Sequence, residues 1–100
     1  MRLVITEFAE KDLVEIESFL KIYSPNRAEE LFDKIFDKFE LITNFPQIGQ
    51  EEFTIKSKSV TLRYVIEKQY KIIYSIEPQN IVIHRVFDTR QNPKKLKIKK

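Results

Sequence analysis

Two arginines near the end of the chain, Arg85 and Arg90, are of a residue type that binds anionic groups. A guanidinium group holds a phosphate or a carboxylate through two parallel hydrogen bonds. Arg85 falls in an apolar run typical of a central strand, and Arg90 follows this run, in a loop position where binding residues are common. For Arg85, a structural ion pair with Glu67 or with a helix carboxylate is an equally good interpretation. The sequence therefore predicts binding at Arg90 and leaves both roles open at Arg85.

His84 is the only histidine, and the chain has no cysteine. A multi-histidine metal site is excluded, and no group of carboxylates is spaced to replace one, so we expect no metal and no cofactor. Strand alternation places His84 on one face with Val82 and Val86. Arg85 should then lie on the opposite face, and Asp88, on the face of His84, could orient the imidazole. A lone strand histidine is more often structural than catalytic.

The composition indicates one soluble globular domain. The chain has 100 residues, 42% of them apolar, and no apolar run long enough to span a membrane. Its short apolar N-terminus does not resemble a signal peptide, and without cysteine a disulfide scaffold is excluded, so we expect a cytoplasmic protein.

The charge is divided unevenly along the chain. Residues 1–50 carry a net charge of −4 and residues 51–100 a net charge of +7. A basic second half suits an acidic protein partner or a nucleic-acid backbone. A solubilising surface with a lysine-rich tail is the alternative interpretation.

The first half of the chain predicts a strand followed by two helices. Residues 3–5 form a β-branched run, and Thr6 is a good N-cap for the helix that follows. Ser24 and Pro25 suit the start of a second helix, and so short a join predicts an antiparallel hairpin. We expect the Phe32/Phe36 edge of the second helix to pack in the core. The apolar positions recur at three- and four-residue steps: Phe8, Ala9, Leu13, Ile16, Phe19, Leu20 and Tyr23, then Ala28, Leu31, Phe32, Ile35, Phe36, Phe39 and Ile42.

The second half predicts an antiparallel meander. Gly49, the only glycine, should supply a positive φ after the second helix, and residues 51–59 suggest a loop or a poor edge strand. Strand-like runs then cover residues 61–67, 70–77 and 80–87, separated by two-residue joins. Tyr70 and Tyr74 should pack in the core. Because the last two runs are apolar on both faces, the face away from the helices needs a second cover, for which a partner chain is one candidate.

The predicted fold class is α+β. An N-terminal strand, an antiparallel two-helix hairpin and a three-strand antiparallel meander form one sheet, which the helices cover on one face. We assign residues 1–93 to a single domain and residues 94–100 to a basic C-terminal tail.

This order of elements, with several residues at matching spacing, resembles the RelE/ParE superfamily of toxins from type II toxin–antitoxin systems, and its ParE-like branch most. The resemblance covers about residues 1–93. The residues that carry it are Ala9, Asp12 and Leu13; Ser24, Pro25 and Ala28; Pro46 and Gly49; Leu62 and Arg63; Tyr70 to Tyr74; and Ile83 to Pro93.

The resemblance implies a cytoplasmic bacterial toxin that a cognate antitoxin neutralises in a toxin–antitoxin hetero-oligomer. Such toxins arrest growth and serve in plasmid stabilisation. ParE-like members inhibit DNA gyrase by binding, which is the function we expect here. RelE-like members instead cleave messenger RNA on the ribosome, without a metal, and this is the alternative. A non-toxic module that only binds the antitoxin is a third possibility.

The RelE-like alternative also implies candidate catalytic residues. Arg63 and Arg90 match arginines that bind phosphate in those nucleases, and we expect the arginines to gather near the exit of the last strand. The tyrosine that follows in the nucleases is missing here. Lys94, Lys95 and His84 are the remaining candidates for proton transfer, and a lysine in a tail is poorly placed for the burial that lowers its pKa.

Overall fold

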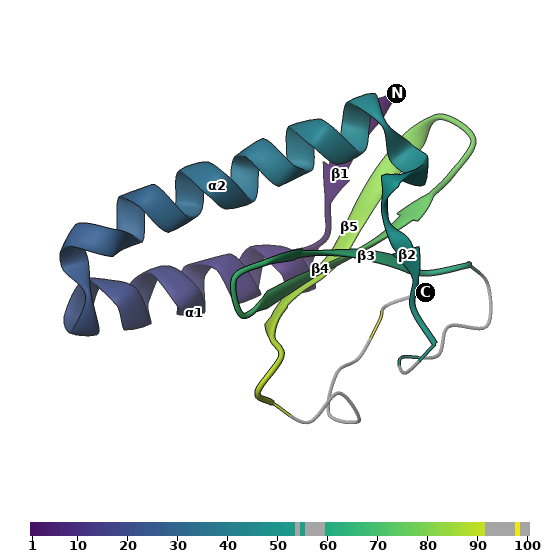
Figure 1. The fold of residues 1–100 in the computed structure, drawn as a ribbon. Coiled ribbons are helices and arrows are strands. Elements are labelled where there is room, and N and C mark those ends of the chain that lie inside the picture. The colour runs from purple at the N-terminus through teal and green to yellow at the C-terminus, as the bar shows by residue number, and fades with distance from the viewer. Residues whose placement is uncertain (54, 56–59, 92–97, 99–100) are drawn as a thin grey trace.

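The computed structural model describes residues 1–53, 55, 60–91 and 98. Its helices and strands confirm the predicted α+β class: a two-helix hairpin lies on one face of a single sheet (Figure 1). The elements are β1 (Arg2–Ile5), α1 (Glu7–Tyr23), α2 (Pro25–Asn44), the 3-10 turn η1 (Pro46–Ile48), β2 (Gln50–Glu51), β3 (Arg63–Glu67), β4 (Tyr70–Ile76) and β5 (Asn80–Asp88).

The helices begin where the sequence predicts. The Thr6 side chain accepts a hydrogen bond from the N–H of Ala9 at 3.2 Å, which satisfies one of the unpaired donors of the first turn of α1. Ser24 ends α1, its N–H bonded to the carbonyl of Leu20 at 2.7 Å, and Pro25 opens α2. The side chain of Ser24 makes no capping hydrogen bond to α2. The join between the helices is therefore one residue long and holds them as a hairpin.

The sheet has five strands in the order β1-β5-β4-β3-β2. Strands β3, β4 and β5 form the predicted antiparallel meander. The N-terminal strand pairs in parallel with β5, with Leu3 opposite Ile81, and so lies at one edge. The two-residue strand β2 pairs with β3 at the other edge, where a loop or a poor edge strand was expected.

A β-bulge at His84 changes the faces predicted for β5. Ile83 pairs with Tyr74 and Arg85 with Ile73, which leaves His84 as the additional residue. The prediction that Val86 shares the face of His84 is therefore wrong, since Val86 packs with Ile83 in the core cluster against the helices. Asp88 lies on the same face as Val86, the face toward the helices, because its partner Tyr70 belongs to the same cluster.

The bulge also corrects the prediction that Arg85 lies opposite His84. Arg85 pairs with Ile73, which belongs to a second cluster on the face away from the helices. His84 bonds Ser75, which lies two residues from Ile73 in β4 and so shares its face. His84 and Arg85 therefore both start from the face away from the helices.

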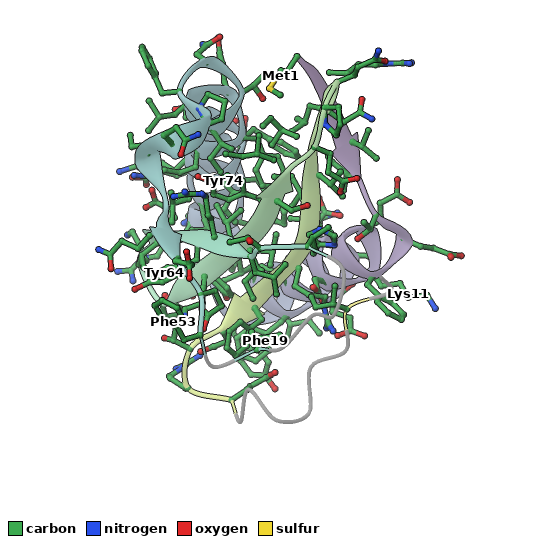
Figure 2. The ribbon with its side chains drawn as sticks, turned by 90° about the vertical axis from the view of Figure 1, so that its right-hand side faces the viewer. Met1, Lys11, Phe19, Phe53, Tyr64 and Tyr74 are labelled. Carbon is green, nitrogen blue, oxygen red and sulfur yellow. The ribbon has the colours of Figure 1, made fainter. Side chains whose placement is uncertain are left out.

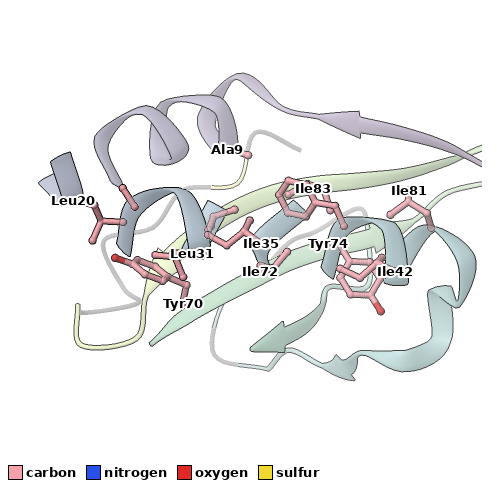
Figure 3. Packing of buried hydrophobic residues seen from close by; sticks show 13 residues of the cluster. Ala9, Leu20, Leu31, Ile35, Ile42, Tyr70, Ile72, Tyr74, Ile81 and Ile83 are labelled. Atoms are coloured by element: carbon pink, nitrogen blue, oxygen red, sulfur yellow. The ribbon is translucent and has the colours of Figure 1, made fainter. Parts of the chain in front are cut away.

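The main core lies between the helix hairpin and the sheet (Figure 3). Tyr70 and Tyr74 are buried there, as predicted. Phe36 is an exception to the predicted core edge of α2: it is 49% exposed and packs edge-on against Phe39. The main cluster comprises Ala9, Leu20, Ala28, Leu31, Ile35, Phe39, Ile42, Tyr70, Ile72, Tyr74, Ile81, Ile83 and Val86.

The other face of the sheet is covered partly by the chain itself. Ile55 and Leu62, from the segment between β2 and β3, pack on Ile73 and Phe87. Glu52 and Lys71 form an ion pair beside this cluster, with the ammonium group 4.3 Å from the centre of the Tyr64 ring. The second cover that the apolar strands require thus comes in part from within the chain.

Gly49 corrects another expectation. Its φ of −74° lies in the extended region, and Lys68, with φ 53°, is the residue with positive φ among those described. The need for glycine comes instead from close packing. A Cβ at Gly49 would lie 2.4 Å from the Tyr74 hydroxyl and 2.9 Å from the Tyr64 carbonyl. The Tyr74 hydroxyl accepts from the Gly49 N–H at 2.9 Å and donates to the Pro46 carbonyl at 2.6 Å, so the tyrosine holds this turn against the sheet.

We predict that Gly49→Ala lowers the free energy of unfolding by about 1–3 kcal/mol, because a methyl group there must displace Tyr74 or the backbone of β3. Urea denaturation of the two proteins measures the difference. Gln47→Ala, an exposed change in the same turn, is the control and should alter stability by less than about 0.5 kcal/mol. Equal stability of the Gly49→Ala and parent proteins would contradict the packing argument.

Candidate functional site

A groove of about 360 Å³ runs between α1 and the C-terminal end of β5. We call it the α1–β5 groove. It brings together acidic, basic and aromatic side chains from elements more than fifty residues apart in the sequence. Its lining residues are Asp12, Glu15, Ile16 and Phe19 from α1, with Tyr70, Arg85, Val86, Phe87, Asp88, Arg90 and Gln91 from the sheet and the segment that follows it.

Asp12 joins the two walls of this groove. Its carboxylate accepts two hydrogen bonds from the Arg85 guanidinium, at 2.7 and 2.8 Å, and a third from the N–H of Val86 at 2.9 Å. The third bond has a topological cause. Strand β1 pairs with β5 only as far as Ile83, so the edge of β5 beyond it has no neighbouring strand, and α1 supplies an acceptor in its place.

The guanidinium of Arg85 is therefore engaged in a structural ion pair. The expectation of an ion pair with a helix carboxylate is confirmed, with Asp12 as the partner. Both side chains are largely buried. A ligand in the groove would have to compete with this two-pronged contact to reach Arg85.

Arg90 is held differently. Its Nε donates to both carboxylate oxygens of Asp88, at 2.9 and 3.0 Å, and its backbone N–H donates to the same group at 2.9 Å. The side chain nevertheless remains 69% exposed. Asp88 thus orients a guanidinium that stays accessible to solvent. The hydrogen bonds from Arg90 in turn keep the pKa of the Asp88 carboxyl below its usual value.

Arg63 lies away from this groove. It pairs with Tyr74 near the far end of β4 and donates to the Gly49 carbonyl at 2.9 Å. Asp88 pairs with Tyr70, four residues along the same strand, which corresponds to about 13 Å at the usual rise per residue. Arg90 lies beyond Asp88. The prediction that the arginines gather near the exit of the last strand holds for Arg85 and Arg90 and is wrong for Arg63, because the antiparallel pairing places the start of β3 at the opposite end.

His84 is buried on the face away from the helices, with 2% of its surface exposed. Its Nε2 lies 2.8 Å from the Ser75 hydroxyl, which also bonds the Glu77 carboxylate at 3.0 Å. Asp88 binds Arg90 instead, so the suggestion that Asp88 orients His84 is wrong. Lys94 and Lys95 lie outside the described residues.

Three ionisable groups that line the groove, those of Tyr70, Asp12 and Asp88, are held protonated or bound to an arginine. Burial, with the nearby charge of Asp88, raises the pKa of Tyr70 above that of a free tyrosine, so its hydroxyl stays protonated. Asp12 and Asp88 each bind an arginine. Among the described residues, no three histidine, cysteine or acidic side chains lie close enough to share a metal ion.

Two lining residues were not recognised as site residues from the sequence. In the sequence, Asp12 is one of the residues that carry the family resemblance. Its role as the partner of Arg85 is visible only in the fold. Phe19 belongs to the apolar stripe of α1, yet 52% of its surface is exposed at the groove. Only the position of α1 along β5 distinguishes these two residues from their neighbours on the helix.

Comparison with known proteins gives a consistent result. The model of the family described as ParE toxin of type II toxin–antitoxin system, parDE, matches residues 3–93. A solved structure of the chromosomal ParDE toxin–antitoxin system from P. aeruginosa has a similar fold, with a TM-score of 0.71 and 19% sequence identity over 88% of this chain and 95% of that chain. No characterised protein matches the chain significantly by sequence. None of the described helices is long and apolar enough to cross a membrane.

We predict that Asp12→Ala destabilises the protein by about 3 kcal/mol, because it leaves a largely buried guanidinium without its counter-charge. Chemical denaturation gives the value. The additional change Arg85→Met should restore part of the loss, since it removes the unpaired charge. Glu15→Ala is the control, since it removes an exposed carboxylate three residues further along α1. It should change stability by less than about 0.5 kcal/mol. A loss no larger for Asp12→Ala than for Glu15→Ala would show that the ion pair contributes little.

The lowered pKa of Asp88 predicts a pH-dependent contribution to stability. When the pKa of a carboxyl group is lower in the folded state than in the unfolded state, the group stabilises the fold at pH values above its unfolded-state pKa, here near 3.8. This stabilisation is lost as the pH falls through the folded-state pKa. The stability difference between the parent protein and Asp88→Asn should therefore be constant down to about pH 5 and shrink below about pH 4. Urea denaturation of both proteins at several pH values measures it. A difference that does not vary with pH would contradict a charged Asp88–Arg90 contact.

Proposed function

The chain belongs to the ParE toxin family of type II toxin–antitoxin systems, and we propose that it arrests growth by binding DNA gyrase rather than by catalysing a reaction. We further propose that it works in the cytoplasm, without a cofactor, and that a cognate antitoxin neutralises it in a hetero-oligomer. The contact with the target is assigned to the α1–β5 groove, with Arg90 as its principal anion-binding residue.

The observation that carries this proposal is the contrast between Arg90 and the other candidate groups. Arg90 is oriented by Asp88 and mostly exposed. Arg85 is occupied by Asp12, and His84 is buried in contact with Ser75. An exposed and oriented arginine beside an aromatic side chain suits binding to a protein surface, where arginine and aromatic residues contribute most of the affinity.

The ribosome-dependent nuclease is the less favoured alternative. Metal-independent cleavage of RNA requires an acid, a base and cations around one phosphate. Arg63 and Arg90 lie near opposite ends of β4 and cannot easily hold one phosphate together. The tyrosine that follows the second arginine in the nucleases is absent from the sequence after Arg90. These features favour binding over chemistry.

The proposed antitoxin contact follows from the surface of the molecule. Apolar side chains remain exposed along α1 at Val14, Phe19, Ile22 and Tyr23, and the second half of the chain is strongly basic. A partner segment with acidic and apolar residues would cover both features. A non-toxic module would keep this contact and lack the effect on growth.

We predict that the purified protein inhibits supercoiling by DNA gyrase in vitro and that Arg90→Ala requires about a tenfold higher concentration for the same inhibition. Lys11→Ala, an exposed change outside the groove, is the control and should inhibit as the parent does. Circular dichroism should show that both variants are folded, since both side chains are exposed.

Translating ribosomes provide the second arm of this experiment. Cleavage of messenger RNA at the decoded codon, with gyrase unaffected, would replace the proposal with the nuclease alternative. Folded protein that affects neither system and does not arrest growth on induction would leave a module that only binds the antitoxin. Equal inhibition by the parent and Arg90→Ala would remove Arg90 from the target contact.

A further inference from the structure

A second groove, of about 510 Å³, lies at the joined end of the helix hairpin. We call it the hairpin-end groove. It adjoins the α1–β5 groove, since Phe19 and Arg90 line both. Figure 1 shows the turn between β3 and β4 reaching toward the helices on this side of the sheet. The residues that line the groove are Phe19, Leu20, Ser24, Arg27, Glu30, Leu31, Lys34, Lys68, Gln69 and Arg90.

The charge of this groove is strongly positive. Three segments of the chain contribute its four cations: Arg27 and Lys34 lie in α2, Lys68 in the β3–β4 turn and Arg90 after β5. Glu30 is the single acidic residue in the lining and lies 3.9 Å from Lys34. Arg27 and Lys68 remain to face a ligand, together with Arg90, whose guanidinium is bound by Asp88 and stays 69% exposed. Such a concentration is unexpected beside helices from the acidic half of the chain.

The floor of the groove is apolar. Leu20 and Leu31 are buried core residues that reach its base, and Phe19 is half exposed at its edge. The ring of Phe19 also packs on that of Tyr23, with the ring centres 4.6 Å apart. An aliphatic side chain of a ligand would remove this apolar surface from water. The sugar–phosphate backbone of a nucleic acid carries no such group.

We propose that the hairpin-end groove binds an acidic peptide segment that places a leucine-like side chain on the floor of Leu20 and Leu31, beside Phe19, and its carboxylates against Arg27, Lys68 and Arg90. The positive rim attracts the carboxylates, and the apolar floor selects peptide over nucleic acid.

The occupant to which we commit is a segment of the cognate antitoxin, so this inference rests on the proposed function. It also gives that function a means of control. Because Arg90 lines both grooves, a carboxylate bound in the hairpin-end groove engages the guanidinium assigned to the target in the α1–β5 groove. Neutralisation then follows from competition for one side chain, without any change of fold.

Fluorescence anisotropy with a labelled synthetic peptide of Glu, Asp and Leu residues tests the site directly, on the full chain. We expect saturable binding that weakens as salt is added. The double variant Arg27→Glu/Lys68→Glu should raise Kd about tenfold, since each exposed charge contributes modestly and both are reversed. Lys11→Glu is the control, because it reverses the charge of an exposed lysine on α1 that does not line the hairpin-end groove. Figure 2 shows Lys11 at the periphery of the molecule.

A second measurement separates the apolar contact from charge. Phe19→Ala should weaken binding of the same peptide and leave its dependence on salt unchanged, because it removes apolar surface and no charge. The peptide should also relieve gyrase inhibition by the parent protein, and not by the double variant at the same concentration.

Several results would overturn the site. Absence of peptide binding, equal binding by the double variant and the parent, or a loss as large for Lys11→Glu would each do so. Tighter binding of a single-stranded oligonucleotide, reduced by the same double variant, would make this a nucleic-acid surface instead. These outcomes are distinct from failure of the proposed function: a protein that binds the peptide and does not inhibit gyrase keeps the groove and loses the target.

Discussion

Strand β5 extends five residues beyond the end of its parallel neighbour β1, and the carboxylate of Asp12 satisfies the edge N–H that this leaves at Val86. The shape of the α1–β5 groove depends on this contact. It fixes the position of α1 along the sheet, and with it the wall of the α1–β5 groove. The same carboxylate pairs with Arg85 and so withdraws one of the two clustered arginines from binding. A largely buried acceptor with three donors is costly to disrupt, so this contact holds α1 against the end of β5.

The bulge at His84 has an equally specific consequence. By adding one residue to β5, it turns Val86 and Asp88 toward the helix side of the sheet. Asp88 is then placed to hold Arg90 beside α1, while His84 is left on the other face with Ser75. Without the additional residue, Asp88 would point away from the helices and the exposed arginine would lose its support. The bulge therefore places Asp88, which orients the exposed Arg90, and the buried His84 on opposite faces of the sheet.

The arrangement of charge explains how one small domain could serve two partners. The α1–β5 groove is lined by three carboxylates and two arginines, whereas the hairpin-end groove is predominantly basic, and Phe19 and Arg90 lie where they meet. Under the proposed function, the target and an acidic antitoxin segment would bind adjoining surfaces and compete for Arg90. Binding, with no chemistry of its own, is sufficient for both a toxic effect and its control.

Local features of the sequence determined the elements and most of the core. Threonine and proline placed the helix starts, the three- and four-residue period gave the buried faces, and two-residue joins gave the meander with Tyr70 and Tyr74 inside it. Tertiary structure alone decided the rest. Gly49 is required by the hydroxyl of a tyrosine 25 residues away, Arg63 is separated from Arg90 by strand register, and the face of Asp88 depends on a bulge. Periodicity reports what a residue faces within its own element. Contacts between distant segments produce no periodic pattern in the sequence. Neither does a one-residue bulge, which exchanges the faces of the residues that follow it in a strand.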